Sequence, residues 1–453
     1  MVIINVFGRD AQITAFFKIT PHRKRKITIL RYLGQDFLSD FMSKINIKYS
    51  LILLFLGLLA LPSARAQSPY SQSDLDKNYD MLLANPGVQI EATEAINKLY
   101  NYKFGDAEAE FNWLRYRYPN HPMPQFLMGL ADWWKIVPNT DNTAYDNRFL
   151  ARMDSCIYLA EKLYDQKENK VEPAFFLAAS YAFKGRLYAE RRQWTKATFA
   201  GKNALKYLEK SKGYGDLSPE LLFGDGIYNY YSEWIPKEYP ILKPVLIFFQ
   251  KGNKKLGIQQ LEKVANNAFY TRVEARYFLL QIYSLENQYG KAYDMAKYMW
   301  QTYPDNPYFE RYFCRSAFVT GHAAEAQQAA RNMLDKIERR MPGYEGVSGR
   351  NAAYVLAYYK FNYEKNYDEA ADYYQKAINF SVQTKSLDAG YYVSSLIGLG
   401  KVAEARKDIE EAQRYYKLAL DKADRKSSQH KEAKKAIDDL KKSRREDRRS
   451  RRR

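Results

Sequence analysis

Four histidines are the side chains best suited to metal or acid–base chemistry, and they stand far apart, at His22, His121, His322 and His430. None has a second histidine or a cysteine at the short spacing with which a zinc site gathers its ligands. Neither the HExxH pattern of zinc proteases nor the GxSxG pattern of serine hydrolases occurs. We therefore expect no metal ion, no cofactor and no catalytic residue in this chain.

Two glycine-containing motifs and two cysteines complete the search for reactive groups. A GLGK run at 398–401 lacks the first glycine and the Ser/Thr of a phosphate-binding loop, and it falls within a predicted helix. The GDG sequence at 224–226 has no strand before it, so it is weak evidence for a nucleotide site. Cys156 and Cys314 are too few for a disulfide framework, and we expect both to be buried as small apolar residues.

The elements that would position any functional residue are helices. From about residue 86 one pattern recurs: an apolar stripe at helical spacing, a short turn and a second such stripe, often closed by a proline. Residues 273–304 are a clear example, with Leu280 on the first helix, Ala292 on the second and Pro304 after it. Three further clear copies follow before residue 424.

The second helix of each copy carries a small or apolar residue at an equivalent position. These positions are 107, 153, 197, 257, 292, 326, 370 and 412, at steps of 34 to 60 residues. We therefore predict about eight helical hairpins between residues 86 and 424. A single hairpin cannot bury its own apolar stripe, so the hairpins must stack on one another.

On the second helix of two C-terminal hairpins, a small residue is followed four positions later by a large one, and packing explains this pattern. Small residues such as Ala370 and Ala412 allow the first helix of the same hairpin to approach closely. Four residues later, on the same helix face, Tyr374 and Tyr416 are large enough to fill the gap between hairpins. The pattern predicts close packing both within and between hairpins.

The C-terminal copies resemble the tetratricopeptide-repeat (TPR) family. The residues that carry the resemblance are Leu396, Leu399 and Gly400 in one helix and Ala412, Tyr416 and Ala419 in the next. The resemblance implies an all-α fold, a right-handed superhelical solenoid of about eight TPR-like hairpins. It also implies that the chain binds other proteins or peptides and is not an enzyme.

The resemblance further implies where a partner would bind, namely on the concave face lined by the first helix of each hairpin. The family's binding positions correspond to Tyr277, Gln281, Arg311, Arg315, Tyr359, Asn362, Tyr363 and Lys401. These side chains suit an extended peptide because they offer hydrogen-bond donors and rigid amphipathic area. The Lys/Asn clamp with which some members hold a chaperone's terminal carboxylate is not reproduced, so we expect no such ligand.

The longest step contains an insert near residues 230–250. Three prolines, at 236, 240 and 244, interrupt helical structure there, and the apolar run VLIFF follows at 245–249. We expect this insert to pack against its own hairpin. The alternative is an exposed apolar flap that contacts a partner or a membrane.

Residues 42–66 have the pattern of a signal peptide. Lys44 and Lys48 precede an apolar stretch at 49–61, and the small residues that a signal peptidase requires end at Ala66. We expect cleavage between Ala66 and Gln67, export to the periplasm, and a polar linker at 67–85. On this interpretation residues 1–41 are a mis-called extension, whereas the alternative is a cytoplasmic tail with an uncleaved anchor at 49–61.

The net charge of +19 lies mainly at the two ends of the chain. Residues 67–424 carry only +3, which argues against a nucleic-acid-binding domain. Residues 425–453 are predicted to be a capping helix followed by a basic disordered tail after Leu440, which could weakly contact an anionic envelope surface. No nucleic-acid partner is expected.

These observations favour a non-catalytic scaffold or adaptor for protein–protein interaction in the cell envelope. The alternatives are a membrane-tethered cytoplasmic adaptor or a non-catalytic subunit of an envelope complex. The third interpretation, after these, is that the chain is an enzyme.

Overall fold

The computed structural model describes residues 81–238, 250–387 and 390–450. Residues 1–41, the predicted signal peptide at 42–66 and most of the linker at 67–85 lie outside these ranges. The described residues form helices and turns and include no strand. They divide into a first unit (81–238, 250–284 and 301–306) and a second unit (285–300, 307–387 and 390–450). Across these ranges, no helix has the length and apolar character to span a membrane.

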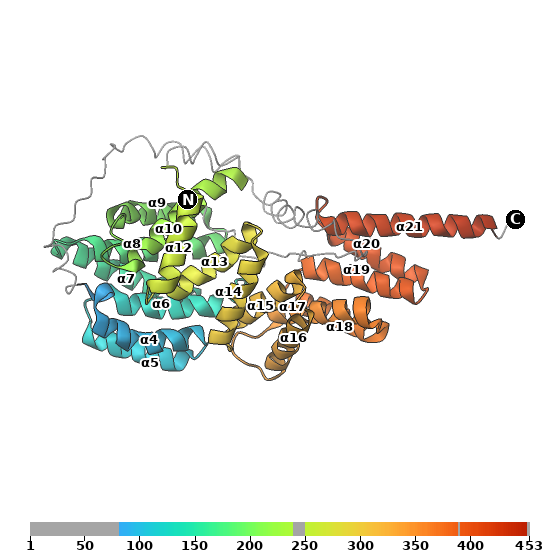
Figure 1. Cartoon of the computed structure of the whole chain (residues 1–453), viewed down its shortest axis with the longest axis horizontal. Helices are drawn as coiled ribbons and strands as arrows, with labels where there is room; N and C mark the ends of the chain where they lie inside the picture. Colours follow the sequence, from blue (N-terminus) through green and yellow to red (C-terminus); the bar gives the residue numbers. More distant parts are fainter. Residues whose placement is uncertain (1–80, 239–249, 388–389, 451–453) are drawn as a thin grey trace. The chain divides into compact units, whose positions relative to one another are not determined.

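The first unit is a series of helices packed on their sequence neighbours (Figure 1). A short 3₁₀ helix, η3, precedes the first long helix, and another, η4, precedes α10. The elements are η3 (Leu82–Ala84), α4 (Pro86–Tyr100), α5 (Phe104–Arg117), α6 (Pro122–Ile136), α7 (Asp146–Gln166), α8 (Val171–Glu190), α9 (Trp194–Ser211), η4 (Pro219–Leu221), α10 (Leu222–Glu238), α12 (Lys254–Asn267) and α13 (Arg272–Leu285).

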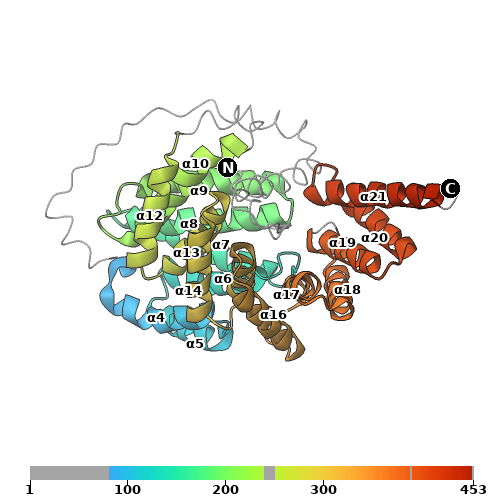
Figure 2. The ribbon, with the colours of Figure 1, turned by 45° about the vertical axis from the view of Figure 1, so that its right-hand side comes forward.

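The second unit continues the same pattern. Figure 2 shows its pairs α17 with α18 and α19 with α20, whose helices lie side by side. A single turn of π-helix, η6, extends α17. The elements are α14 (Tyr289–Thr302), α15 (Pro307–Thr320), α16 (Ala323–Glu338), α17 (Gly346–Tyr359), η6 (Lys360–Glu364), α18 (Tyr367–Gln383), α19 (Gly390–Ala405), α20 (Ile409–Lys422) and α21 (Ser428–Ser450).

The predicted repeat solenoid is confirmed, including its register upstream of residue 257. Each of the eight marker positions falls in a separate helix, and each is buried. The helices that contain them are α5, α7, α9, α12, α14, α16, α18 and α20. The hairpins therefore follow one another as the spacing of small residues indicated.

Local signals explain where several helices begin. The side chain of Asn85 accepts hydrogen bonds from the N–H groups of Gly87 and Val88, and Pro86 occupies the first helical position. Asn366 caps α18 and Asp408 caps α20 in the same manner. These caps satisfy N–H groups that have no partner inside the helix.

At the C-terminal hairpins, tyrosine rings pack against glycines of the neighbouring helix. A Cβ atom added at Gly398 would lie 2.4 Å from the ring of Tyr374, which fills the gap between two hairpins as predicted. A Cβ atom at Gly400 would lie 2.5 Å from the ring of Tyr416. Tyr416 thus packs against the first helix of its own hairpin, which corrects the prediction that it fills the gap between hairpins.

Three predicted boundaries differ from the structure. Residues 81–85 belong to the folded unit, because Met81 and Leu83 are buried there. Helix α21 continues to Ser450, although disorder was expected after Leu440. Lys, Arg and Glu, which make up most of this segment, have high helix propensity. In the predicted insert, Pro236 lies inside α10, and residues 239–249 fall outside the described ranges.

Candidate functional site

The inner face of the first unit is a packed core. Tyr277 and Gln281 of α13 were predicted to line a binding groove, yet they are only 1% and 3% exposed. The Tyr277 hydroxyl accepts a 2.6 Å hydrogen bond from Arg186, whose guanidinium also lies over the ring of Trp133. Trp134 packs edge-to-face on Tyr277. In this structure both predicted residues stabilise the fold and are inaccessible to a peptide.

A buried carboxylate holds together the helices that make this inner face inaccessible to a peptide. Oε1 of Glu274 on α13 accepts hydrogen bonds from the indole N–H of Trp134 (2.7 Å) and from the hydroxyl of Tyr100 on α4 (3.1 Å). Asn306, near the end of the unit in sequence, donates its side-chain amide to the backbone carbonyl of Tyr100 at 2.8 Å. These contacts bring the last part of the first unit back to its first long helix.

Two other buried carboxylates make similar long-range contacts. Glu220 in η4 accepts hydrogen bonds from the backbone N–H groups of residues 269–271 and from the hydroxyl of Thr271. Glu172 of α8 accepts a 2.7 Å hydrogen bond from the backbone N–H of Leu83. Burial raises the pKa of both Glu220 and Glu274 above the ordinary value for a glutamate. These carboxylates act as structural anchors, which local helical periodicity does not reveal.

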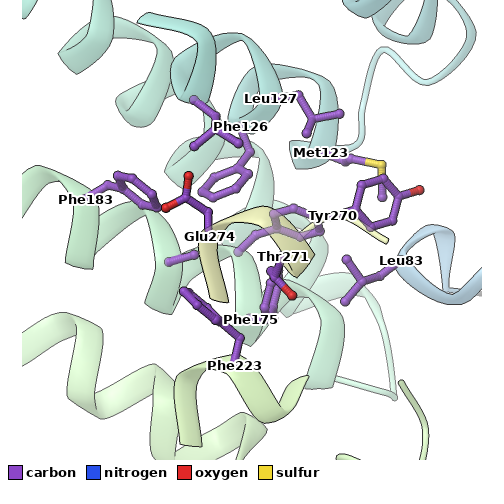
Figure 3. Close-up of a pocket in the computed structure, with 13 residues that line it drawn as sticks. Leu83, Met123, Phe126, Leu127, Phe175, Phe183, Phe223, Tyr270, Thr271 and Glu274 are labelled. Atoms are coloured by element: carbon purple, nitrogen blue, oxygen red, sulfur yellow. The ribbon is translucent and has the colours of Figure 1, made fainter. Parts of the chain in front are cut away.

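A cavity of about 30 Å³ lies inside the first unit, and aromatic and aliphatic side chains surround it (Figure 3). Phe126, Phe175, Phe183 and Tyr270 contribute rings to its wall, and Glu274 also lines it. This volume corresponds to one or two water molecules. The cavity is therefore too small to serve as a site for an organic substrate or cofactor.

In the second unit, Arg311 and Arg315 of α15 are also largely buried, with exposures of 5% and 8%. Each guanidinium lies over the ring of the tyrosine three residues earlier, Arg311 over Tyr308 at 5.4 Å and Arg315 over Tyr312 at 5.3 Å. Arg311 also donates to the hydroxyl of Ser348 on α17 at 3.3 Å. Cation–π contacts stabilise these charges and hold both arginines against their own helix.

Three of the eight predicted residues, Tyr359, Asn362 and Tyr363, come together where α17 ends in the π turn. Tyr363 is 55% exposed, whereas Tyr359 is 5% exposed and lies beneath it, with ring centroids 5.5 Å apart. The amide of Asn362 donates to the backbone carbonyl of Tyr358 at 2.8 Å. The π turn closes at Lys365, which has a left-handed backbone conformation with φ of 56°. Such turns are rare and often mark functional positions.

The tyrosine cluster, defined as Phe318, Tyr358, Tyr359 and Tyr363, joins the C-terminal ends of α15 and α17. The ring of Phe318 meets Tyr358 at 4.9 Å and Tyr359 at 5.8 Å, both edge-to-face. Within the described part of the chain, no hydrogen bond involves the hydroxyls of the three tyrosines. Tyrosine phenols are protonated at neutral pH and can donate hydrogen bonds, and burial raises the pKa of Tyr358 and of Tyr359 further above the ordinary value.

Lys401, the last predicted residue, lies on α19. Its ammonium forms a 2.6 Å ion pair with Glu432 of α21, and its side chain is about one-third exposed. This contact fixes α21 against the preceding hairpin. Lys401 therefore has a structural role that its position in the repeat did not predict.

The structure also explains the other motifs that the sequence suggested. The GLGK run lies inside α19, where its glycines make room for tyrosine rings. Nδ1 of His121 caps α6 by accepting from the N–H of Met123, and Cys156 and Cys314 are free and buried. Across the described ranges, no group of three or more His, Cys, Asp or Glu side chains could hold a metal ion.

No family model matches the chain, and no curated protein matches it. Among solved structures it is similar to a human IFIT1 dimer with PPP-AAAA (13% identity, TM-score 0.35, 71% of this chain and 68% of that one). It is also similar to yeast Tom70 (12%, 0.26, 79% and 96%) and to the TPR domain of P58(IPK) (13%, 0.20, 82% and 98%). These TM-scores are too low to transfer an activity or a partner to this chain.

Proposed function

We propose that this protein is a non-catalytic scaffold that binds an extended segment of another protein at the tyrosine cluster. The observation that carries the proposal is the set of three tyrosine hydroxyls without hydrogen-bond partners in the described residues, grouped around the exposed ring of Tyr363. The hydroxyls of Tyr358 and Tyr359 are not among the buried polar atoms that lack a partner, so they remain accessible and can donate to backbone carbonyls of a ligand.

The chemistry of the cluster favours an extended segment that contains proline. Aromatic-lined surfaces recognise such segments because the rings pack on proline while hydroxyl groups bind the exposed carbonyls. The rings of the cluster are held by edge-to-face contacts, so binding would order only Tyr363. A preorganised surface loses little conformational entropy when it binds.

The sequence at 42–66 supports a location outside the cytoplasm for this scaffold. We place it in the cell envelope on the pattern of the apolar stretch and its cleavage motif alone. The alternative is an adaptor tethered through residues 49–61. Mass measurement of the native protein distinguishes the two, because removal of residues 1–66 leaves a chain that begins at Gln67.

Site-specific photo-crosslinking in living cells tests the proposed function. A photo-reactive residue at position 363 should give one reproducible adduct, identified by mass spectrometry. The same residue at Gln375, which is exposed on α18, is the matched control and should not give that adduct. The double variant Tyr358→Phe/Tyr359→Phe keeps the rings and removes two hydroxyls, so it should reduce the adduct at position 363 at least five-fold. An undiminished adduct in that variant, or no adduct at position 363, would contradict the proposal.

A further inference from the structure

Helix α9 of the first unit presents a face of lysines to solvent. Lys196, Lys202, Lys206 and Lys210 are all exposed. At 100° per residue these side chains fall within one-third of the helix circumference, opposite the small residues that pack on α8. Within the described residues, no ion pair neutralises any of these four lysines.

The charge of this face is high for a domain that is otherwise nearly neutral. Between Trp194 and Lys212 there are five lysines and one acidic residue, Glu209, which gives a net charge of +4. Glu209 lies 3.9 Å from Lys212 at the end of the helix. Since residues 67–424 together carry only +3, this short segment concentrates positive charge on one surface.

The chain that precedes α12 adds one more lysine near the end of α9. The ammonium of Lys212 donates to the side chain of Gln250 at 3.3 Å, which places residue 250 beside the end of α9. Lys251 follows and is exposed. The basic face is defined as Lys196, Lys202, Lys206 and Lys210 of α9, with Lys212 and Lys251 beside the end of the helix.

A large apolar side chain projects from this basic face. Phe199, between Lys196 and Lys202 in the sequence, is 65% exposed. Phe199 lies on the same side of α9 as the lysines, so it does not contribute to the packing of the hairpin. Exposed apolar groups among lysines are the pattern of helices that bind to the surface of a bilayer.

We propose that the basic face of α9 binds the surface of an anionic phospholipid bilayer. The lysines contact lipid phosphates, and Phe199 enters the boundary between head groups and acyl chains. Clusters of four to eight basic residues on an amphipathic helix are typical of anionic-lipid recognition. The surface is independent of the tyrosine cluster, so the two proposals can fail separately.

The residue types favour a bilayer over nucleic acid. Lysine binds the phosphates of lipids and of nucleic acids alike, but sequence-specific recognition of bases typically uses the planar guanidinium of arginine, and the helical part of this face contains only lysine. Long lysine side chains can extend from an apolar boundary to the charged head groups. The protruding Phe199 has no role in a purely electrostatic contact with a polyanion.

The experiment places an environment-sensitive dye on the basic face of the full chain. The two native cysteines are buried, so a Thr195→Cys variant, at an exposed position of α9 next to Lys196, can be labelled at one accessible position. Vesicles of phosphatidylcholine with 30% phosphatidylglycerol should shift the dye emission to the blue, and vesicles of phosphatidylcholine alone should not. A Gln383→Cys variant, labelled on α18, is the matched control and should show no shift.

Charge-reversal variants test the role of the lysines. Lys202→Glu/Lys206→Glu should reduce partitioning onto the anionic vesicles at least ten-fold, measured by co-sedimentation at physiological salt. Lys376→Glu/Lys417→Glu changes the net charge equally on exposed positions of the second unit and should alter partitioning less than two-fold. Phe199→Ser should weaken binding about three-fold or more without changing the folding transition.

Three results would overturn the proposal. The first is a dye shift that does not depend on phosphatidylglycerol, because the lysines would then contribute nothing to binding. The second is equal partitioning of the two charge-reversal variants. The third is tighter binding to a single-stranded polynucleotide than to the vesicles, lost in Lys202→Glu/Lys206→Glu but unchanged in Phe199→Ser, which would identify the surface as a nucleic-acid site.

Discussion

The indole N–H of Trp134 on α6 donates a 2.7 Å hydrogen bond to Oε1 of Glu274 on α13, across 140 residues of sequence. Neither side chain is accessible to solvent, and the same oxygen accepts from Tyr100 on α4. One carboxylate thus links three helices that are distant in the chain. The inner face of the first unit is therefore fixed by hydrogen bonds as well as by apolar packing.

Replacement of this carboxylate should destabilise the first unit. Glu274→Ala leaves the Trp134 and Tyr100 donors buried without an acceptor, and we expect a loss of about 2–5 kcal/mol in the free energy of unfolding. Glu274→Gln keeps an acceptor oxygen and should cost about 1 kcal/mol. Urea denaturation followed by tryptophan fluorescence measures both. Glu168→Ala, at an exposed position, serves as the control, and an equal loss in all three variants would contradict the assigned role.

Asp225 on α10 should make the stability of the first unit depend on pH. Burial raises the pKa of this carboxyl to about 6, against the opposing effects of the Gly213 N–H and of Lys212. Because the folded protein holds the proton more tightly than the unfolded chain, deprotonation destabilises the fold as pH rises from about 4 to about 6. The pKa shift corresponds to a loss on the order of 3 kcal/mol in the free energy of unfolding. This loss has fully developed once the pH is above 6.

The variant Asp225→Asn removes this titration and keeps an acceptor for the Gly213 N–H. The difference in unfolding free energy between Asp225→Asn and the unmodified protein should therefore increase between pH 4 and pH 6 and then stay constant. Urea titrations at several pH values measure it. A difference that is the same at pH 4 and pH 7 would show that Asp225 does not titrate in this range.

Gly398 should not tolerate a methyl group. A Cβ atom there would overlap the ring of Tyr374 at 2.4 Å, so Gly398→Ala should lower stability by about 1–3 kcal/mol. Gly290 is the matched control, because it lies near the start of α14 with open space around it. Gly290→Ala should raise stability by about 0.4–1 kcal/mol. Thermal unfolding compares the two, and a stable Gly398→Ala variant would show that the Tyr374 ring can move aside.

The two cysteines should be unreactive in the folded protein. Burial raises the pKa of the Cys156 thiol to about 12, and it raises the pKa of Cys314 as well. A thiol-specific reagent at pH 8 should therefore label neither residue in native protein and both in urea. Mass spectrometry of the labelled chain measures the number of modified cysteines, and rapid labelling without urea would indicate that one site opens readily.

The sequence was sufficient to predict the helices and their order because the information is local. Alanine and glycine at helical spacing, such as Ala370 and Gly400, specify which helices approach closely, and this depends only on residues within one hairpin. The binding residues were harder to predict because accessibility depends on the whole unit. Tyr277 occupies a position that is open in a loosely wound solenoid, but the contacts of Glu274 close the first unit over it.

The tyrosine cluster illustrates the same limit. Tyr359, Asn362 and Tyr363 were predicted from their repeat positions, whereas Phe318 and Tyr358 were not, because they join the cluster through packing between two hairpins. The π turn that positions Tyr363 adds a residue to the end of α17 and has no simple sequence signature. The long-range anchors Glu172 and Glu220 looked like ordinary helix-surface acids.

The return of residues 301–306 to α4 has a consequence for how the first unit comes apart. In an open repeat array the terminal hairpin has one neighbour and can fray while the rest stays folded. In the first unit the hydrogen bond from Asn306 to the Tyr100 carbonyl gives the first hairpin a second neighbour from the other end of the chain segment. Peeling off the first hairpin must also break this contact, so the first hairpin should fray less readily than the terminal hairpin of an open array.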